Sequence, residues 1–221
     1  MKTNEDLQLD VENAIKWEPL MDAAEIGVTA KDGVITLTGV VDSYAKKLEA
    51  ENAAKTVYGV NAVVEKVEVK FDTYRSKKED NDIANEVLKA FKWNWQIPDA
   101  QLKVKVEKGW VTLEGTLEWN FQKEAASNAV RNLLGVTGVS NKIVIKAEKD
   151  EVEKKDIESA LKRNWYFNDQ DIEVSVSGNN VKIKGRVNSY YAKDEAEQIA
   201  WNAPGVSTVD NEIIIVNDYA D

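Results

Sequence analysis

The sequence predicts an α+β protein built from three copies of one small two-layer sandwich module. A strand motif, Gly109-Trp110-Val111-Thr112-Leu113-Glu114-Gly115, recurs upstream at 33–39 and downstream at 179–185. The glycine that ends each motif stands twenty residues before a Gly-Val pair. The six glycines of this spacing are Gly39 and Gly59, Gly115 and Gly135, and Gly185 and Gly205. Helical and strand-like hydrophobic periodicities also alternate in the same order in all three copies, as expected for a repeat.

The copies divide the 221 residues into modules at 1–70, 77–147 and 149–217. A unit of this size buries only about 60 % of the surface that its unfolded chain exposes, so each module is expected to be marginally stable alone. The connectors near 70–78 and 146–149 contain neither Gly nor Pro. We therefore expect neighbouring modules to pack together rather than to hang on flexible linkers.

Each module should begin with an amphipathic helix. Apolar residues at helical spacing define its inner face: Leu7, Val11, Ala14 and Ile15; Ile83, Val87, Ala90 and Phe91; and Ile157, Ala160 and Leu161. Asn4, Asp80 and Asp150 stand just before these runs, where a side-chain oxygen can cap the free N–H groups of a helix start. Residues 76–79 offer the second copy an alternative capping box.

A β-hairpin follows in each module. Alternating apolar residues at 26–30, 102–106 and 172–176 predict the first strand, and Asp32-Gly33, Lys108-Gly109 and 178–180 predict tight turns where positive φ is cheap. The glycine that ends the second strand of each hairpin falls in register with the inward-facing residues. A glycine at such a position fits a bulge or the close approach of a helix backbone.

A second helix and a third strand complete each module. Stripes of small apolar residues predict helices over 43–58, 119–134 and 189–203, each ended by a C-cap glycine: Gly59, Gly135 or Gly205. The last strand runs through 67–69, 143–145 and 213–215. The order is α-β-β-α-β, with both helices on one sheet face. Val144 and Ile214 interrupt the polar outer face, and they could mark contacts between modules.

Composition excludes several classes of function. The chain has no Cys and no His, so disulfides, thiolate chemistry, the usual catalytic triads and the commonest metal ligand are absent. No nucleotide-binding glycine motif or nucleophile elbow is present. A net charge of −10 disfavours nucleic acid as a partner.

We expect a non-enzymatic binding protein, with no transmembrane span. The first residues lack a signal peptide's apolar core, so a cytoplasmic location is expected, or a periplasmic one if a leader was removed.

The repeated motifs resemble tandem BON-domain proteins. The resemblance rests on Gly-x-Val-Thr-Leu-x-Gly at 109–115 and Gly-Val-x-x-Val-x-Asn-x-Ile-x-Ile at 135–145, with matching segments in the other copies. The first copy departs at Glu65, where the others have Asn, and the third at Asn179, where the others have Gly. The resemblance implies an αββαβ fold and a non-enzymatic role in bacterial osmotic or envelope stress. It also implies association with phospholipid surfaces, potassium binding, or chaperone-like contacts with other proteins.

An aromatic cluster after the first helix is the leading candidate site. It comprises Trp17 in the first copy, Trp93-Asn94-Trp95 in the second and Trp165-Tyr166-Phe167 in the third. These rings fit two roles, and the favoured one is packing at the open end of each sandwich. The alternative is an interfacial belt at lipid headgroups, assisted by Lys89 and Lys92 in the second copy and by Lys162 and Arg163 in the third.

The middle module is the best lipid-binding candidate because its charge differs from that of its neighbours. Residues 71–147 carry 12 Lys/Arg and 10 Asp/Glu, or +2, whereas residues 1–70 carry 8 and 13, or −5. Residues 148–221 carry 9 and 16, or −7. The leading functional hypothesis is therefore reversible binding of a phospholipid surface through Lys89, Lys92, Trp93 and Trp95.

Two further groups of side chains suggest other functions. Trp110, Trp119 and Trp201, together with Val144 and Ile214, could serve an interface with another module or protein, because aromatic residues are enriched at interfaces. Acidic residues at 80–82, and at 169–171 in a loop, offer oxygen ligands to a cation, although neither segment has EF-hand spacing. Solvated loop acids are the ordinary interpretation. A potassium site made of backbone carbonyls would leave no side-chain pattern, so a potassium-responsive protein remains the alternative function.

Overall fold

The three repeats fold as three αββαβ modules. The computed structural model describes residues 2–21, 26–71, 78–98, 102–146, 152–164, 167 and 172–216. The first module comprises α1 (Asn4–Trp17), β1 (Ile26–Lys31), β2 (Val34–Val41), α2 (Tyr44–Thr56) and β3 (Ala62–Val69). The second comprises α3 (Asp80–Trp93), β4 (Leu102–Glu107), β5 (Trp110–Leu117), α4 (Asn120–Arg131) and β6 (Gly138–Ile145). The third comprises α5 (Lys154–Arg163), β7 (Ile172–Ser177), β8 (Asn180–Val187), α6 (Tyr190–Trp201) and β9 (Thr208–Ile215).

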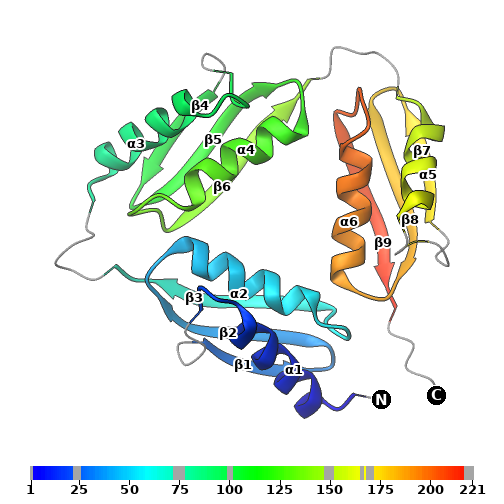
Figure 1. Cartoon of the computed structure of the whole chain (residues 1–221), viewed down its shortest axis with the longest axis horizontal. Coiled ribbons are helices and arrows are strands. Elements are labelled where there is room, and N and C mark those ends of the chain that lie inside the picture. The colour runs from blue at the N-terminus through cyan, green and yellow to red at the C-terminus, as the bar shows by residue number, and fades with distance from the viewer. Residues whose placement is uncertain are drawn as a thin grey trace.

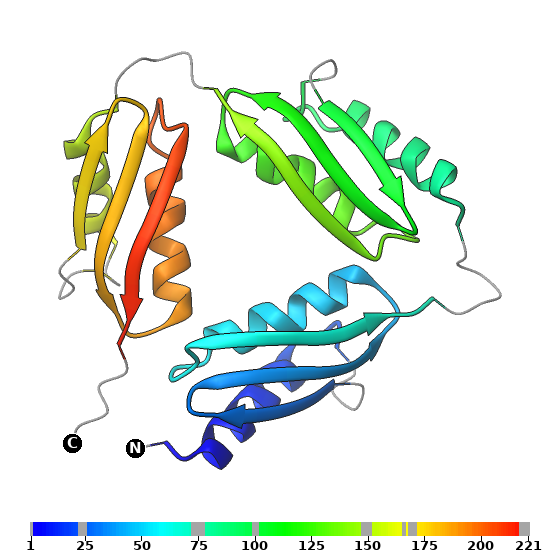
Figure 2. The same ribbon diagram turned by 180° about the vertical axis from the view of Figure 1, so that it is seen from behind.

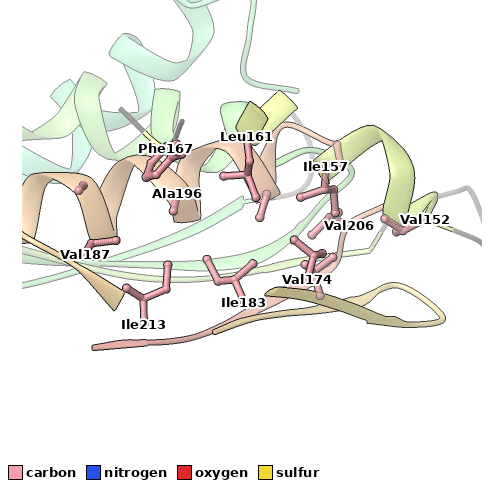
Figure 3. Close-up of a cluster of buried hydrophobic side chains, with 14 residues drawn as sticks. Val152, Ile157, Leu161, Phe167, Val174, Ile183, Val187, Ala196, Val206 and Ile213 are labelled. Atoms are coloured by element: carbon pink, nitrogen blue, oxygen red, sulfur yellow. The ribbon is translucent and has the colours of Figure 1, made fainter. Parts of the chain in front are cut away.

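Each module is a three-stranded sheet covered on one face by two helices. The first two strands form an antiparallel hairpin, and the third strand lies parallel to the second, so that the hairpin's second strand is central. The second helix is the crossover that this parallel pairing requires. Each module has its own hydrophobic core between its helices and its sheet. Figure 3 shows this core in the third module, where Ile157 and Leu161 of α5 lie over Val174 and Ile183 of the sheet.

The modules are arranged around a common centre. In Figure 1 the helices of all three modules lie toward the viewer, and each module turns its second helix toward the other two. In Figure 2 the three sheets lie in front. The molecule therefore has one broad side made of helices and an opposite side made of sheets, with the first helices at the periphery.

The central strands are regular, and the bulge, one of the two roles expected for their glycines, is absent from them. Gly39 pairs with Val67 and Gly115 with Ile143 in an uninterrupted register, and the third module repeats the pattern. The glycines take φ values of 143° to 150°, which side-chain-bearing residues rarely adopt. Their role is therefore a backbone conformation within a continuous ladder.

The expected helix caps at Asn4 and Asp80 are wrong. Thr3 is the N-cap of α1, and its hydroxyl forms a capping box with Asp6. Asn4 is the first helical residue, and its side-chain oxygen accepts a hydrogen bond from the backbone N–H of Asp32 at 2.9 Å. Asp80 likewise accepts from the hairpin turn of its own module. The Asn4 side chain thus joins α1 to the turn at 32–33, and the Asp80 side chain joins α3 to the turn at 108–109. Asp150 lies outside the described residues.

The glycines after the second helices are also not C-caps. The C-cap residues are Val57, Asn132 and Asn202, two or three positions earlier. Gly59, Gly135 and Gly205 lie in the turn that follows, with φ between 92° and 99°. A Cβ on Gly135 would approach the side chain of Ile83 to 2.9 Å, so this turn packs directly against α3.

Contacts between modules come from the helices and not from the outer sheet faces. Val144 and Ile214 are 62 % and 63 % exposed, so the expectation that they lie between modules is wrong. Instead Tyr44, at the start of α2, and Trp201, at the end of α6, pack against the core of the second module. The expected packing of neighbouring modules is thus present, at Trp201, an expected interface residue, and at Tyr44, which was not expected.

Candidate functional site

Helix α3 has one buried face and one exposed face that is both apolar and basic. Ile83, Val87 and Phe91, spaced four residues apart, are buried in the core of the second module. Residues 88, 89, 92 and 93 fall on the opposite side of the helix, because successive residues turn by about 100°. Leu88 and Trp93 are 54 % and 87 % exposed, and Lys89 and Lys92 are also exposed.

Trp95 continues this exposed surface beyond the end of α3. The helix stops at Trp93 because Asn94 takes an extended conformation, and the Asn94 side chain accepts a hydrogen bond from the backbone N–H of Gln96 at 3.0 Å. That turn leaves Trp95 89 % exposed. The described structure thus exposes the four predicted residues, Lys89, Lys92, Trp93 and Trp95, in one segment of chain. We call this segment, with the exposed Leu88, the α3 end.

The favoured packing interpretation is wrong for three of the tryptophans. Trp17, Trp93 and Trp95 are each more than 85 % exposed and plug no core. Phe167, in contrast, is only 5 % exposed and lies beside Ala196 in the core of the third module (Figure 3). Trp165 and Tyr166 lie outside the described residues.

The residues buried near the open end of each sandwich occupy one repeat position, which no motif of the sequence singles out. This position holds Met21, Ile97 and Phe167 in the three modules. Ile97 is 4 % exposed, and Met21 is partly buried against the core of the first module. In the sequence this position is marked by an apolar residue at a constant distance from the Gly-Val pair. The larger tryptophans beside it are the stronger candidates for packing when the sequence alone is considered.

The helical positions of the α3 end carry different residues in the other two modules. The helical positions of Leu88, Lys89, Lys92 and Trp93 are occupied in α1 by Glu12, Asn13, Lys16 and Trp17, and in α5 by Glu158, Ser159, Lys162 and Arg163. At these four positions, only the second module combines two lysines with two large apolar side chains and no acid. Among the described residues, neither Lys89 nor Lys92 has an ion-pair partner, so both charges remain available to a ligand.

The other candidate aromatic residues are dispersed. Trp110 is 48 % exposed on the outer face of β5 and lies over Gly138, where a Cβ would meet the indole ring at 2.3 Å. Trp119 stacks obliquely on Phe121, with ring centroids 6.4 Å apart. Val144 and Ile214 also face the outer sheet side. Val144 lies at the other end of the sheet from Trp110, since Trp110 pairs with Gly138 and Val144 with Thr116, and Ile214 belongs to the third module. They form no single site with it.

Cation-binding groups are not gathered in the described part of the chain. Its residues contain no cluster of three or more acidic side chains placed to hold a metal ion. Asp80, in the first of the two acidic segments, belongs to the first turn of α3 and already accepts hydrogen bonds from a hairpin turn. The segment at 169–171 lies outside the described residues. One open cavity of about 230 Å³ lies between α1 and β1, lined by Glu12, Ile15, Lys16, Ile26 and Val28.

Across the described ranges, no helix is long and apolar enough to cross a bilayer.

The three modules are BON domains, and the chain belongs to the BON-domain family. The family model for the BON domain matches residues 3–70, 79–147 and 149–217. The resemblance expected from the glycine motifs is thereby confirmed, as is the fold of three αββαβ modules.

A curated relative carries the same resemblance. "Osmotically-inducible protein Y" of Escherichia coli (strain K12) is 29 % identical over 127 residues, which are 56 % of this chain and 63 % of that protein. The matched region thus spans less than two thirds of the relative's length. Among solved structures, CdsD of the Chlamydia trachomatis type III secretion system aligns over 97 % of this chain and 94 % of its own. At 17 % identity and a TM-score of 0.26, that likeness carries no argument about function.

Proposed function

We propose that this protein binds anionic phospholipid surfaces reversibly through the α3 end, without catalysing a reaction. The observation that carries the proposal is the exposure of Trp93 and Trp95 beside two unpaired lysines. Exposing large aromatic rings to water is unfavourable, and indole rings are stabilised at the boundary between lipid headgroups and acyl chains. Lysine stems lie along apolar surface while their ammonium groups remain in water, so Lys89 and Lys92 suit the same boundary.

The charge distribution sets the orientation and the strength of binding. A basic residue near an anionic membrane contributes about 1 kcal/mol, and the contribution falls off within a Debye length. Two lysines and two tryptophans therefore supply a weak attraction that salt reduces. The acidic first and third modules oppose this attraction when they approach the surface, so the second module must meet the membrane first.

The proposed biological setting is osmotic stress in bacteria. The name of the Escherichia coli relative and membership of the BON-domain family support this setting. A non-catalytic role is supported by the absence of Cys and His from the sequence. Weak and salt-dependent surface association suits such a setting, because ionic strength changes during osmotic stress.

Liposome flotation of paired variants tests the site. We expect Lys89→Glu/Lys92→Glu and Trp93→Ala/Trp95→Ala to lose flotation with phosphatidylglycerol vesicles. Trp17→Ala is the matched control, because Trp17 has the same repeat position and the same exposure as Trp93 but lies in an acidic module. This control should float like the unmodified chain.

Two outcomes would redirect the proposal. Equal loss in Trp17→Ala and in the α3-end variants would assign binding to aromatic residues in general, contrary to the proposed site. No flotation of any protein would favour the alternative of a potassium-responsive protein. Thermal unfolding in potassium and in sodium at equal ionic strength would then test that alternative, because a ligand that binds only the folded state raises its unfolding temperature.

A further inference from the structure

The contact between the first and second modules is made by the start of α2. Tyr44, the first residue of this helix, is half-buried and packs against the core of the second module. A hydrogen bond joins the Tyr44 hydroxyl to the backbone of Val139 in β6, and the charge of Arg131, at the end of α4, acts on it. Burial raises the pKa of Tyr44, which agrees with a ring enclosed between two modules.

Residues at the same two repeat positions are also buried or in contact at the other two modules' helix ends. Tyr44, Asn120 and Tyr190 each begin the second helix of their module, and Lys55, Arg131 and Trp201 occupy one equivalent position near its end. Between the second and third modules, Asn120 is buried, and Trp201 packs against the core of the second module. Between the third and first, the Lys55 Nζ lies 5.4 Å from the centre of the Tyr190 ring.

These contacts run in one direction around the molecule. The start of α2 meets the second module, and the end of α6 also meets the second module. The start of α6 meets the end of α2 in the first module. Interfaces of this head-to-tail kind close a ring when the rotation between units permits it. Figures 1 and 2 show the three modules following one another around the centre in this way. Helices α2 and α6 lie in contact although no connector joins their modules.

Lys55 is placed to hold the closing contact. Its ammonium group forms an ion pair with Glu51 at 2.9 Å on its own helix, and it is also attracted by Asp194 of α6. Glu197 of α6 adds a further negative charge beside Asp194. Burial lowers the pKa of Lys55, but the Glu51 hydrogen bond and the neighbouring acids raise it by more, so the ammonium remains charged. Lys55 is thus a cation among acids of two modules that are both negatively charged.

We propose that the three modules form a closed ring with internal threefold pseudo-symmetry, and that Lys55 acts as the clamp joining the third module to the first. The clamp's partner surface is the start of α6, with Tyr190 and Asp194. Without it, the third module is held only through the second. The ring then opens at the α2–α6 contact, because the charges of the first and third modules repel each other.

A distance measurement between α2 and α6 tests the clamp in the full chain. Asn52 and Gln198 are exposed on these helices, and the chain has no Cys, so Asn52→Cys/Gln198→Cys places spin labels at those two positions only. We expect one narrow, short distance in the otherwise unmodified chain. Lys55→Glu should shift the distribution to longer and broader distances and increase the radius of gyration measured by X-ray scattering.

Matched variants separate the clamp from general effects of charge. Lys154→Glu breaks the ion pair of Lys154 with Glu158, also four residues apart, on the peripheral helix α5, and it should leave the distance unchanged. Lys55→Glu/Asp194→Lys exchanges the two charges and should restore the short distance. Circular dichroism checks that each variant is folded; if Lys55→Glu is not, Lys55→Met removes the charge alone and should lengthen the distance. An unchanged distance in a folded Lys55 variant, or equal opening in Lys154→Glu, would overturn the proposal.

Discussion

The carboxylate of Asp80, in the first turn of α3, accepts a hydrogen bond of 2.9 Å from the backbone N–H of Gly109 in the hairpin turn. Its other oxygen accepts from the backbone N–H of Lys108 at 2.8 Å. Two residues far apart in the sequence are thereby joined, and the first helix of the second module is fixed against its sheet. In the first module Asn4 makes the corresponding contact with Asp32.

Removing this contact should destabilise the second module. Hydrogen bonds to a charged group are worth more than neutral ones, so we expect Asp80→Ala to cost about 1–2 kcal/mol in the free energy of unfolding. Asn81→Ala, at the neighbouring exposed position, should cost under about 0.5 kcal/mol. Urea unfolding followed by circular dichroism measures both. Equal effects of the two substitutions would show that the contact with the turn adds no stability.

The turn itself should be sensitive to substitution at Gly109. This glycine has a φ of 79°, and a Cβ would approach the carbonyl oxygen of Gly135 to 2.5 Å. Gly178 also has positive φ but no atom within 4 Å of its Cβ position. Positive φ alone costs a non-glycine residue about 1–2 kcal/mol. Gly178→Ala should therefore cost about that amount, and Gly109→Ala clearly more. Equal urea midpoints for the two variants would contradict the close approach.

Substitutions in the aromatic cluster that follows the first helices should affect stability according to burial. Phe167→Ala is expected to destabilise the third module by about 3–5 kcal/mol, because a large buried ring is removed and a cavity remains. Trp95→Ala should change the free energy of unfolding by less than about 0.5 kcal/mol, since Trp95 is 89 % exposed. Thermal unfolding would distinguish them. A large loss in Trp95→Ala would restore the packing interpretation.

Much of the fold could be predicted from the sequence, because each strand and helix has a hydrophobic period and three copies repeat it in register. The partner of Asp80 could not, since a carboxylate before an amphipathic run looks the same whether it caps its own helix or binds a distant turn. The tryptophans were equally ambiguous: an indole ring suits a core and an interface alike. The contact of Tyr44 lies at a helix end, outside any periodic pattern, so no signal in the sequence marked it. Trp201 was a candidate interface residue because aromatic side chains are enriched at interfaces.

Alkaline pH should weaken the contact between the first and second modules. Burial raises the folded-state pKa of Tyr44 above its ordinary value of 10.0. Between the unfolded and folded pKa values the folded chain keeps a proton that the unfolded chain has lost, so stability falls as the pH rises above 10. Tyr44→Phe should lose this part of the pH dependence. Urea unfolding at pH 9 and pH 10.5 gives the slope, and the absorbance titration of tyrosinate should lose its latest phase. An unchanged slope in Tyr44→Phe would contradict the assignment.

Flotation of the unmodified chain with phosphatidylglycerol vesicles and with neutral phosphatidylcholine vesicles, each at low and physiological salt, tests the central claim most directly. Attraction through Lys89 and Lys92 is electrostatic and screened by ions, whereas insertion of Trp93 and Trp95 alone would depend little on lipid charge. The account predicts flotation with the anionic vesicles only, strongest at low salt. Equal flotation with both vesicle types, or none with either, would contradict it.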